Sequence, residues 1–287
     1  MNAEVHPARR LWAAIEPVHA VGYFTPEVKS AGQAIGLKGF WMTYFAFRAA
    51  PMGPVGPGVV AATFAGFHPV MVRRAVPDAW RFATPEACLE ARLALSAGTL
   101  RELGVDDEAG RRAADLLAPV IAGLDGTGRP LFAANAELPE PDGQVERLWQ
   151  VTTTVREHRG DGHVAALVAA GVDGVSAHVL QAPAKKLPPA MFRTARGLSE
   201  ADWAAAAARL AARGLLTEGE TPELTDAGRA LVAEVEARTD ERSWSGGLAA
   251  LGEDGVDAVV AALRPAGEAI AASGFMPYPN PVGLPRG

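Results

Sequence analysis

Apolar residues recur at helical spacing along most of this chain, and few runs alternate as strands do. The stretch 144–159 is an example, since its apolar face is formed by Val145, Leu148, Trp149, Thr152 and Val155. Alanine, the strongest helix former, is abundant throughout. The pattern predicts a mainly α fold.

Capping signals place several helix boundaries. Thr-Pro-Glu occurs at 25–27 and again at 84–86, and each copy predicts a helix start. Ser199 should open a helix that runs to Arg213, and Thr225 should open a longer one. Gly160 predicts the end of the helix from residue 144, with Asp161 capping a new helix that reaches residue 170.

The segment 138–143, Leu-Pro-Glu-Pro-Asp-Gly, interrupts the apolar periodicity with prolines and acids. It predicts a domain boundary. Residues 1–143 would form a helical domain that contains the aromatic-rich segment. Residues 144–287 would form a winged-helix domain followed by C-terminal helices.

Bulk composition narrows the function classes. The chain has 287 residues and a net charge of −6, which disfavours a nucleic-acid partner. The single cysteine, Cys88, excludes an internal disulfide and a cysteine-based zinc site. There is no apolar run long enough to span a bilayer and no signal-peptide core, so we expect a soluble, cytoplasmic protein without a membrane partner.

The region 198–238 resembles a MarR-type winged helix. A helix ends in Ala-Arg-Gly-Leu-Leu at 212–216, and Leu-Thr-Asp-Ala-Gly-Arg follows at 224–229. The resemblance implies a short β-hairpin wing between these motifs and a dimerisation helix after it. A homodimer is compatible with this pattern. The expected fold is therefore an all-α N-terminal region joined to a MarR-like winged helix.

This winged helix lacks the side chains that read DNA. Its recognition helix carries alanine at every position from 204 to 208, and its basic residues, Arg209 and Arg213, lie at the far end. Three glutamates occupy the wing region 217–223, where they would repel phosphates. The remaining local basic residues are Lys185, Lys186, Arg193 and Arg196, which we interpret as a solvated face, with a phosphate contact as the alternative.

The densest run of functional side chains is the segment 156–163, Arg-Glu-His-Arg-Gly-Asp-Gly-His. His158, His163 and Asp161 are its candidate catalytic residues, because imidazole and carboxylate groups exchange protons. Arg159 could hold a carboxylate or phosphate, beside free backbone N–H groups at the new helix start. Purely structural roles for all of them, or a metal site formed by the two histidines and the aspartate, are alternatives.

A second candidate region surrounds the aromatic stretch 40–47. An aromatic wall with a few polar groups is typical of a ligand pocket. The candidate ligand-binding residues here are His19, Trp41, Tyr44, Arg48 and His68. The alternatives are that the aromatic residues form ordinary core and that His68 starts a helix; a haem ligand or proton shuttle at His68 is a further alternative.

Taken together, several short segments look like a family of actinobacterial helix-turn-helix proteins. They are 23–28, 39–42, 48–51, 67–69, 77–80 and 156–163. The resemblance implies a winged-helix fold over nearly the full chain. It brings no catalytic assignment, and a regulatory role for such proteins rests on fold alone.

Three functions remain open at this point. The first is binding, with or without chemical transformation, of a small organic anion in a pocket between the aromatic helices and the segment 156–163. The second is a ligand-responsive transcriptional regulator with a continuous basic face. The third is a dimerisation or scaffold module without a pocket. The sequence names neither the ligand nor a cofactor.

Overall fold

The computed structural model describes residues 5–280, which form helices joined by short loops. The first half contains α1 (Pro7–Phe24), α2 (Val28–Ala34), α3 (Gly39–Ala49), η1 (Ala50–Met52), α4 (Pro57–Thr63), α5 (Pro69–Arg73), α6 (Ala79–Phe82), α7 (Pro85–Glu102), α8 (Asp107–Ile121) and α9 (Pro130–Ala136). The second half contains α10 (Gln144–Ala169), α11 (Gly174–Lys185), α12 (Pro189–Arg196), α13 (Glu200–Ala212), α14 (Asp226–Trp244), η2 (Gly246–Leu251) and α15 (Gly252–Ser273). The predicted mainly α fold is confirmed.

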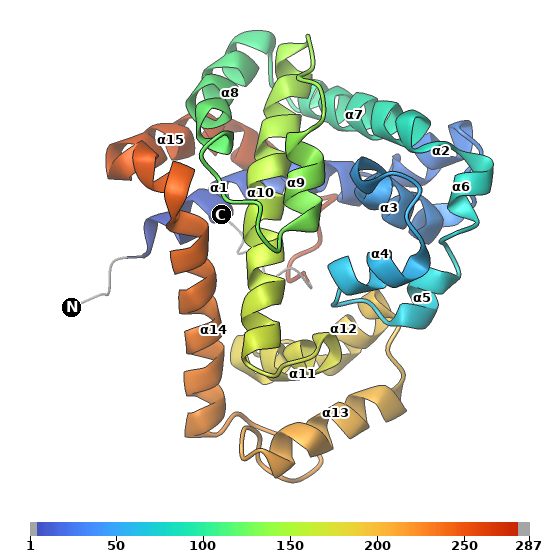
Figure 1. The fold of residues 1–287 in the computed structure, drawn as a ribbon, viewed down its shortest axis with the longest axis vertical. Coiled ribbons are helices and arrows are strands. Elements are labelled where there is room, and N and C mark those ends of the chain that lie inside the picture. The colour runs from blue at the N-terminus through green and yellow to red at the C-terminus, as the bar shows by residue number, and fades with distance from the viewer. Residues whose placement is uncertain (1–4, 281–287) are drawn as a thin grey trace.

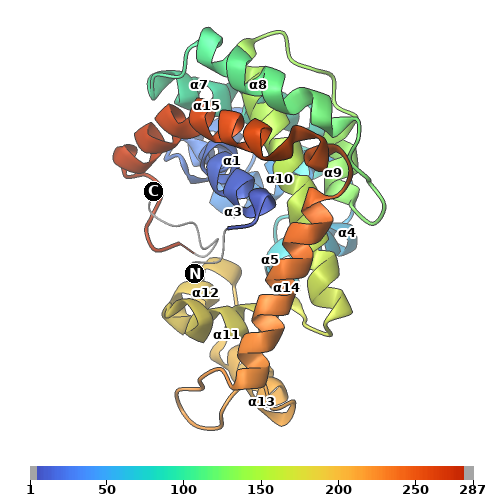
Figure 2. The same cartoon turned by 90° about the vertical axis from the view of Figure 1, so that its left-hand side faces the viewer.

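Two long helices connect the two ends of the molecule. In Figures 1 and 2, α1, α7, α8 and α15 lie together at one end, and α11, α12 and α13 lie at the other. α10 and α14 run between these groups and pack against each other. Each long helix therefore has one part beside α1, α7, α8 and α15, which we call the helical body, and one part beside α11, α12 and α13, which we call the α11–α13 unit.

Several predicted helix starts are confirmed. The Thr84 hydroxyl accepts a hydrogen bond from the Ala87 N–H at 3.2 Å and caps α7. Ser199 and Asp202 form a capping box at the start of α13. Thr225 caps α14 by accepting from the Gly228 N–H at 3.0 Å. The start at 25–27 is displaced, because the Thr25 hydroxyl bonds to Glu27 and α2 begins at Val28.

The predicted break at Gly160 is wrong, because α10 runs without interruption to Ala169. Gly162 serves a different purpose. A Cβ atom at this position would collide with the Arg129 guanidinium, which donates a hydrogen bond to the carbonyl of His158. Glycine in a helix costs about 1 kcal/mol, but here it allows close packing against a distant residue.

The predicted β-hairpin wing is also wrong. No strand is present in residues 5–280, and the loop after α13 closes through one antiparallel bridge between Leu216 and Leu224. The Thr217 N–H donates to the Glu223 carbonyl at 2.9 Å beside this bridge. Pro222 lacks a backbone N–H, so it cannot extend the ladder. The unit therefore consists of helices α11, α12 and α13 with a short closed loop.

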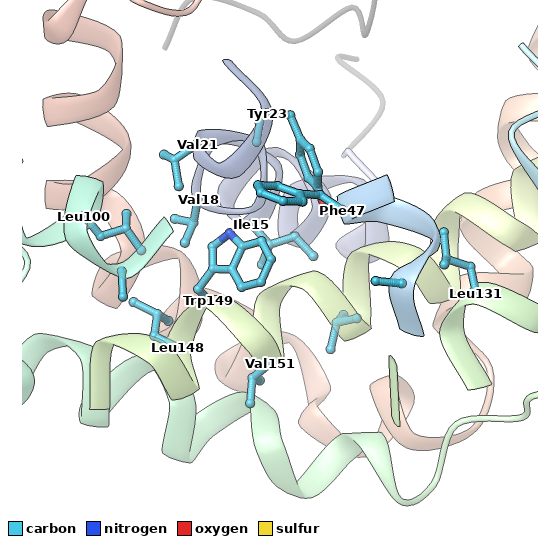
Figure 3. Close-up of a cluster of buried hydrophobic side chains, with 14 of the residues drawn as sticks. Ile15, Val18, Val21, Tyr23, Phe47, Leu100, Leu131, Leu148, Trp149 and Val151 are labelled. Carbon is cyan, nitrogen blue, oxygen red and sulfur yellow. The ribbon is translucent and has the colours of Figure 1, made fainter. Parts of the chain in front are cut away.

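The buried apolar residues fall into two clusters. The larger one surrounds Trp149, which is 0% exposed and packs among residues of α1, α3, α7 and α10 (Figure 3). The smaller one lies in the α11–α13 unit and includes Leu180, Leu210 and Leu224. The larger cluster contains residues from both sides of position 143, and the division of the chain there stays a prediction.

Within residues 5–280, no single helix is both long and apolar enough to cross a bilayer. α10 and α11 reach that length and apolarity only as a pair, which is bent by 97° at the junction.

Candidate functional site

A large cavity lies between the helical body and the α11–α13 unit. Its volume is about 1170 Å³, and α1, α10, α11 and α14 supply most of its walls. The walls are largely apolar, with contributions from Val164, Leu167, Leu180, Leu231, Val232 and Val235. A concave, mostly apolar space with a few polar groups is the usual form of a small-molecule site.

One face of α10 borders this cavity. The residues concerned follow helical spacing and are Arg156, Arg159, Gly160, His163, Val164 and Leu167. Their regular spacing depends on α10 being continuous through Gly160 and Gly162. Of the candidates in the segment 156–163, the structure therefore places Arg159 and His163 on the cavity wall.

Arg159 is partly neutralised where it meets α14. Its Nη2 donates to Asp240 Oδ1 at 2.8 Å and lies 3.6 Å from Glu236. Arg9 on α1 shares both carboxylates, at 2.8 Å from Asp240 and 2.5 Å from Glu236. The Arg159 guanidinium also lies over the ring of Trp12, 5.0 Å from its centre. These contacts hold α1, α10 and α14 together at the cavity rim.

His163 is a neutral group at this wall. Its Nδ1 lies 3.0 Å from the Thr239 hydroxyl, which itself donates to the Val235 carbonyl at 2.7 Å. Since that hydroxyl proton is already used, the hydroxyl accepts from His163, and we assign the proton to Nδ1. Desolvation lowers the pKa of His163 to about 4. Its Nε2 is therefore an acceptor at neutral pH.

His178 on α11 is a second neutral histidine at the cavity. Its Nε2 lies 2.9 Å from the carbonyl of Gly66, so this nitrogen is the donor. Desolvation lowers the pKa of His178 to about 3. The ring stacks on Phe192, with the centres 5.3 Å apart. Together, the two histidines add polarity to the wall without adding charge.

His158 and Asp161 point away from the cavity, toward α9. Asp161 Oδ2 accepts the backbone N–H groups of Leu131 and Phe132, each at 2.9 Å. The ring of His158 packs edge-on against Phe132, with the centres 4.8 Å apart. Desolvation raises the pKa of Asp161 to about 6 and lowers the pKa of His158 to about 4.

The predicted anion site at a helix start near Asp161 is therefore wrong. Asp161 does not begin a helix of its own; it caps α9 from a neighbouring helix. Residues 161–163 lie inside α10, where backbone N–H groups are used within the helix. In the part of the chain that the structure describes, no group of three or more histidine, cysteine, aspartate or glutamate side chains is arranged to hold a metal ion.

A second, smaller cavity of about 100 Å³ lies beside the aromatic stretch. It brings together four candidate residues, which are His19, Trp41, Tyr44 and Arg48. His19 Nδ1 lies 3.1 Å from the Thr153 hydroxyl, and desolvation lowers the pKa of His19 to about 3. The rings of Trp41 and Tyr44 meet edge to face with centres 5.6 Å apart.

A network of buried ion pairs lies beside the small cavity, and one of its members, Arg156, also borders the large cavity. Arg48 Nη2 donates to Glu157 at 2.9 Å, and its Nη1 donates to the Tyr44 hydroxyl at 3.1 Å. Arg156 bonds to Glu16 at 2.8 Å and to Glu157 at 3.0 Å. The charges of these arginines hold the pKa of Glu157 at about 2 in spite of its burial, which acts in the opposite direction.

His68 lies at neither cavity. It caps α5 by accepting the Val70 N–H at Nδ1, 3.3 Å away. Its Nε2 lies 3.9 Å from Asp202 Oδ2, and the backbone N–H of His68 donates to the carbonyl of Arg196 at 3.0 Å. His68 therefore connects the N-terminal helices to the α11–α13 unit.

Sequence reasoning missed the two residues that border both cavities, Arg156 and Arg196. Arg196 belongs to the basic run 185–196, which we interpreted as a solvated face. The members of that run separate in the structure. Lys185 and Arg196 line the large cavity, whereas Arg193 pairs with Glu200 at 3.0 Å.

Two basic side chains at the end of α13 have partners within the protein. Arg209 on α13 pairs with Asp173 at 2.9 Å. Arg213 donates to the carbonyls of Ala170 and Gly171, at 3.1 and 2.7 Å, and so caps the end of α10. The exposed face of α13 carries Ala201, Ala204, Ala205 and Ala208.

Helices α11, α12 and α13 follow one another along the chain at one end of the molecule and are joined by short loops (Figure 1). The chain matches the Helix-turn-helix family over residues 8–277, and it therefore belongs to that family. Neither a curated protein nor a solved structure matches the sequence.

Proposed function

We propose that this helix-turn-helix protein binds a small organic anion in the large cavity between α1, α10, α11 and α14. The charge of the cavity lining carries the proposal. Its described part contains one carboxylate, Glu236, and six basic side chains, which are Arg9, Arg10, Arg156, Arg159, Lys185 and Arg196. The first four pair with carboxylates, whereas Lys185 and Arg196 make no ion pair among residues 5–280 and leave the lining with an excess of positive charge. The apolar walls favour a ligand with a hydrocarbon or aromatic body.

Binding is favoured over proton-transfer chemistry. A general base works best when its pKa lies near the working pH. The pKa of His163 is about 4 and that of His178 is about 3, so both are weak bases at neutral pH. His158 and Asp161 lie outside the cavity and cannot act on a ligand there. Polar contacts from His163 then serve to orient a ligand.

A ligand-responsive regulator that binds DNA is the second candidate, and family membership favours it. The surface chemistry of α13 argues against it. Its outer face carries alanines, and Arg209 and Arg213 are already engaged. Glu218, Glu220 and Glu223 are exposed in the neighbouring loop. Duplex DNA binding depends on cations that meet phosphates, and this face offers few.

A pair of fluorescent probes tests the proposal. Anilinonaphthalene sulfonate carries an anionic group, whereas phenylnaphthylamine has the same aromatic rings without the charge. We expect both to bind and the sulfonate to bind more tightly, because the lining is basic. Absence of binding by both probes would refute the proposal.

Two variants on α10 locate the binding site. Val164→Trp places a bulky ring inside the large cavity and should markedly weaken binding of both probes. Val168→Trp is the matched control, because Val168 is 70% exposed and outside the cavity lining. Equal binding by the two variants would place the probes elsewhere.

Anisotropy of a labelled random DNA duplex at low salt separates the two candidates. The proposal expects no saturable binding. Salt-sensitive association that is lost in Arg209→Ala would instead support the regulator.

A further inference from the structure

Arg196 occupies an unusual position in the wall between the two cavities. It is the last residue of α12, and its side chain borders the large cavity on one side and the small aromatic cavity on the other. The guanidinium lies over the ring of Phe67, 4.4 Å from its centre. A group at this point can therefore meet a ligand that enters from the large cavity.

Unlike its neighbours, Arg196 has no carboxylate partner. Arg156 pairs with Glu16 and Glu157, and Arg48 pairs with Glu157. Among residues 5–280, Arg196 makes no ion pair, and its Nε is buried without a hydrogen-bond partner. Desolvation lowers the pKa of Arg196, the neighbouring Tyr44 side chain acts in the opposite direction, and the charges of Arg48 and Arg156 lower the pKa further.

The local charge balance shows the same deficit of anions. Glu16 and Glu157 compensate Arg48 and Arg156. A further buried arginine, Arg92, is held by the Phe47 carbonyl at 2.9 Å and the Asn135 side-chain oxygen at 3.0 Å. Glu16 and Glu157 already pair with Arg48 and Arg156, so neither carboxylate is left to pair with Arg196. Arg196 is half-buried and its Nε is fully buried, and a cation removed from water without an anion is costly.

We propose that Arg196 is the anchor for the anionic group of the ligand, and that the ligand is an amphipathic carboxylate. This inference rests on the proposed function and names its ligand class. One unpaired guanidinium matches the single charge and planar shape of a carboxylate. The hydrocarbon part would then lie in the large cavity against Val164, Leu167 and Leu231.

Competition against phenylnaphthylamine tests the ligand class, because this reporter is neutral. Dodecanoate and dodecanol share one hydrocarbon chain and differ in the charged group. With the unmodified protein, dodecanoate should displace the reporter at a concentration about tenfold lower than dodecanol. Equal potency of the two competitors would overturn the proposal.

Two arginine variants on α12 test the anchor. Arg196→Met removes the charge and keeps most of the side-chain length, and it should make the two competitors equal within about twofold. Arg193→Met is the matched control, because Arg193 lies one turn earlier, pairs with Glu200 and does not line the cavity. It should retain the preference for dodecanoate. A preference that persists in Arg196→Met would overturn the anchor.

Stability of the empty protein adds a second readout. Since Arg196 has no ionic partner, Arg196→Met should melt at the same temperature as the unmodified protein or higher. A variant that fails to fold would contradict the proposal, because the guanidinium would then support the fold. If anilinonaphthalene sulfonate binds more tightly than phenylnaphthylamine and its binding is weakened by Val164→Trp but not by Val168→Trp, the proposed function stands even when the anchor fails.

Discussion

The segment 156–163 contains two kinds of site on opposite faces of α10. On one face, Arg159 and His163 border the large cavity and contact α14. On the other face, His158 and Asp161 contact α9 and support its first turn. Residues of the same types, a few positions apart, therefore differ in role because the helix turns them toward different neighbours.

The comparison shows that chemical type alone is a weak guide to function. The pKa values of His158 and His163 are both lowered to about 4 by desolvation, so the pKa shift does not distinguish them. Their partners do. The ring of His158 meets Phe132, whereas His163 bonds to Thr239 and still faces open space.

The largest expected effect comes from Glu157, which is buried and bonded to Arg48 and Arg156. Glu157→Gln leaves Arg48 without a carboxylate partner and Arg156 with Glu16 alone, so the free energy of unfolding should fall by about 3–5 kcal/mol. Urea denaturation measures this. Glu234→Gln is the control, since Glu234 pairs with Arg238 at the surface and should cost less than about 1 kcal/mol. Similar losses in the two variants would contradict the buried network.

A smaller loss of stability is expected on the α9 face. Asp161→Ala leaves the N–H groups of Leu131 and Phe132 without a partner, which should lower the unfolding free energy by about 2 kcal/mol. Probe affinity should stay unchanged, because Asp161 does not line the cavity. A variant of normal stability with weakened probe binding would break the comparison between the two faces.

Acid should destabilise the protein through its buried histidines. The pKa values of His19, His158, His163 and His178 are lowered to about 3 or 4, so the folded protein keeps them neutral. The unfolded chain binds protons below about pH 6.5, and stability is therefore lost as the pH falls from there toward the folded pKa values. Asp161 acts oppositely, because its pKa is raised to about 6.

One histidine variant tests this sign. In His158→Leu, the decrease of the unfolding free energy with falling pH should be shallower by about 1.4 kcal/mol per pH unit below about pH 6.5. Urea titrations at a series of pH values measure the slope. An unchanged slope would mean that His158 is protonated in the folded protein.

The smallest effect is expected at the cavity rim. Arg159 already shares its charge with Asp240 and Glu236, so Arg159→Met should weaken dodecanoate binding only about threefold. Competition against phenylnaphthylamine measures the change. A loss as large as that expected for Arg196→Met would make Arg159, and not Arg196, the anchor.

Local signals in the sequence predicted much of the fold. The caps at Thr84, Ser199 and Thr225 act within a few residues, and the structure confirms them. The predicted break at Gly160 is wrong because a glycine inside a helix costs only about 1 kcal/mol, and the neighbouring Gly162 gives Arg129 room to pack on α10 from a distant loop. The predicted β-hairpin wing is wrong because the motifs at 212–216 and 224–229 mark the two ends of a loop but do not specify how many backbone hydrogen bonds the loop forms.

The candidate site was only partly accessible from the sequence. Density of functional side chains singled out the segment 156–163, yet the assumed helix break hid which side chains share a face. Arg196 looked like its neighbours Lys186 and Arg193, because charge patterns do not show which member of a basic run turns inward. That depends on Phe67 and on the cavity walls, which come from other parts of the chain.

Hydrogen–deuterium exchange with and without dodecanoate tests the central claim most directly. If the ligand binds in the large cavity, exchange should slow in α11 and in residues 159–167 of α10, which line it. Exchange in α9 and in the outer helix α13 should not change. Protection confined to α13, or no protection anywhere, would contradict the account.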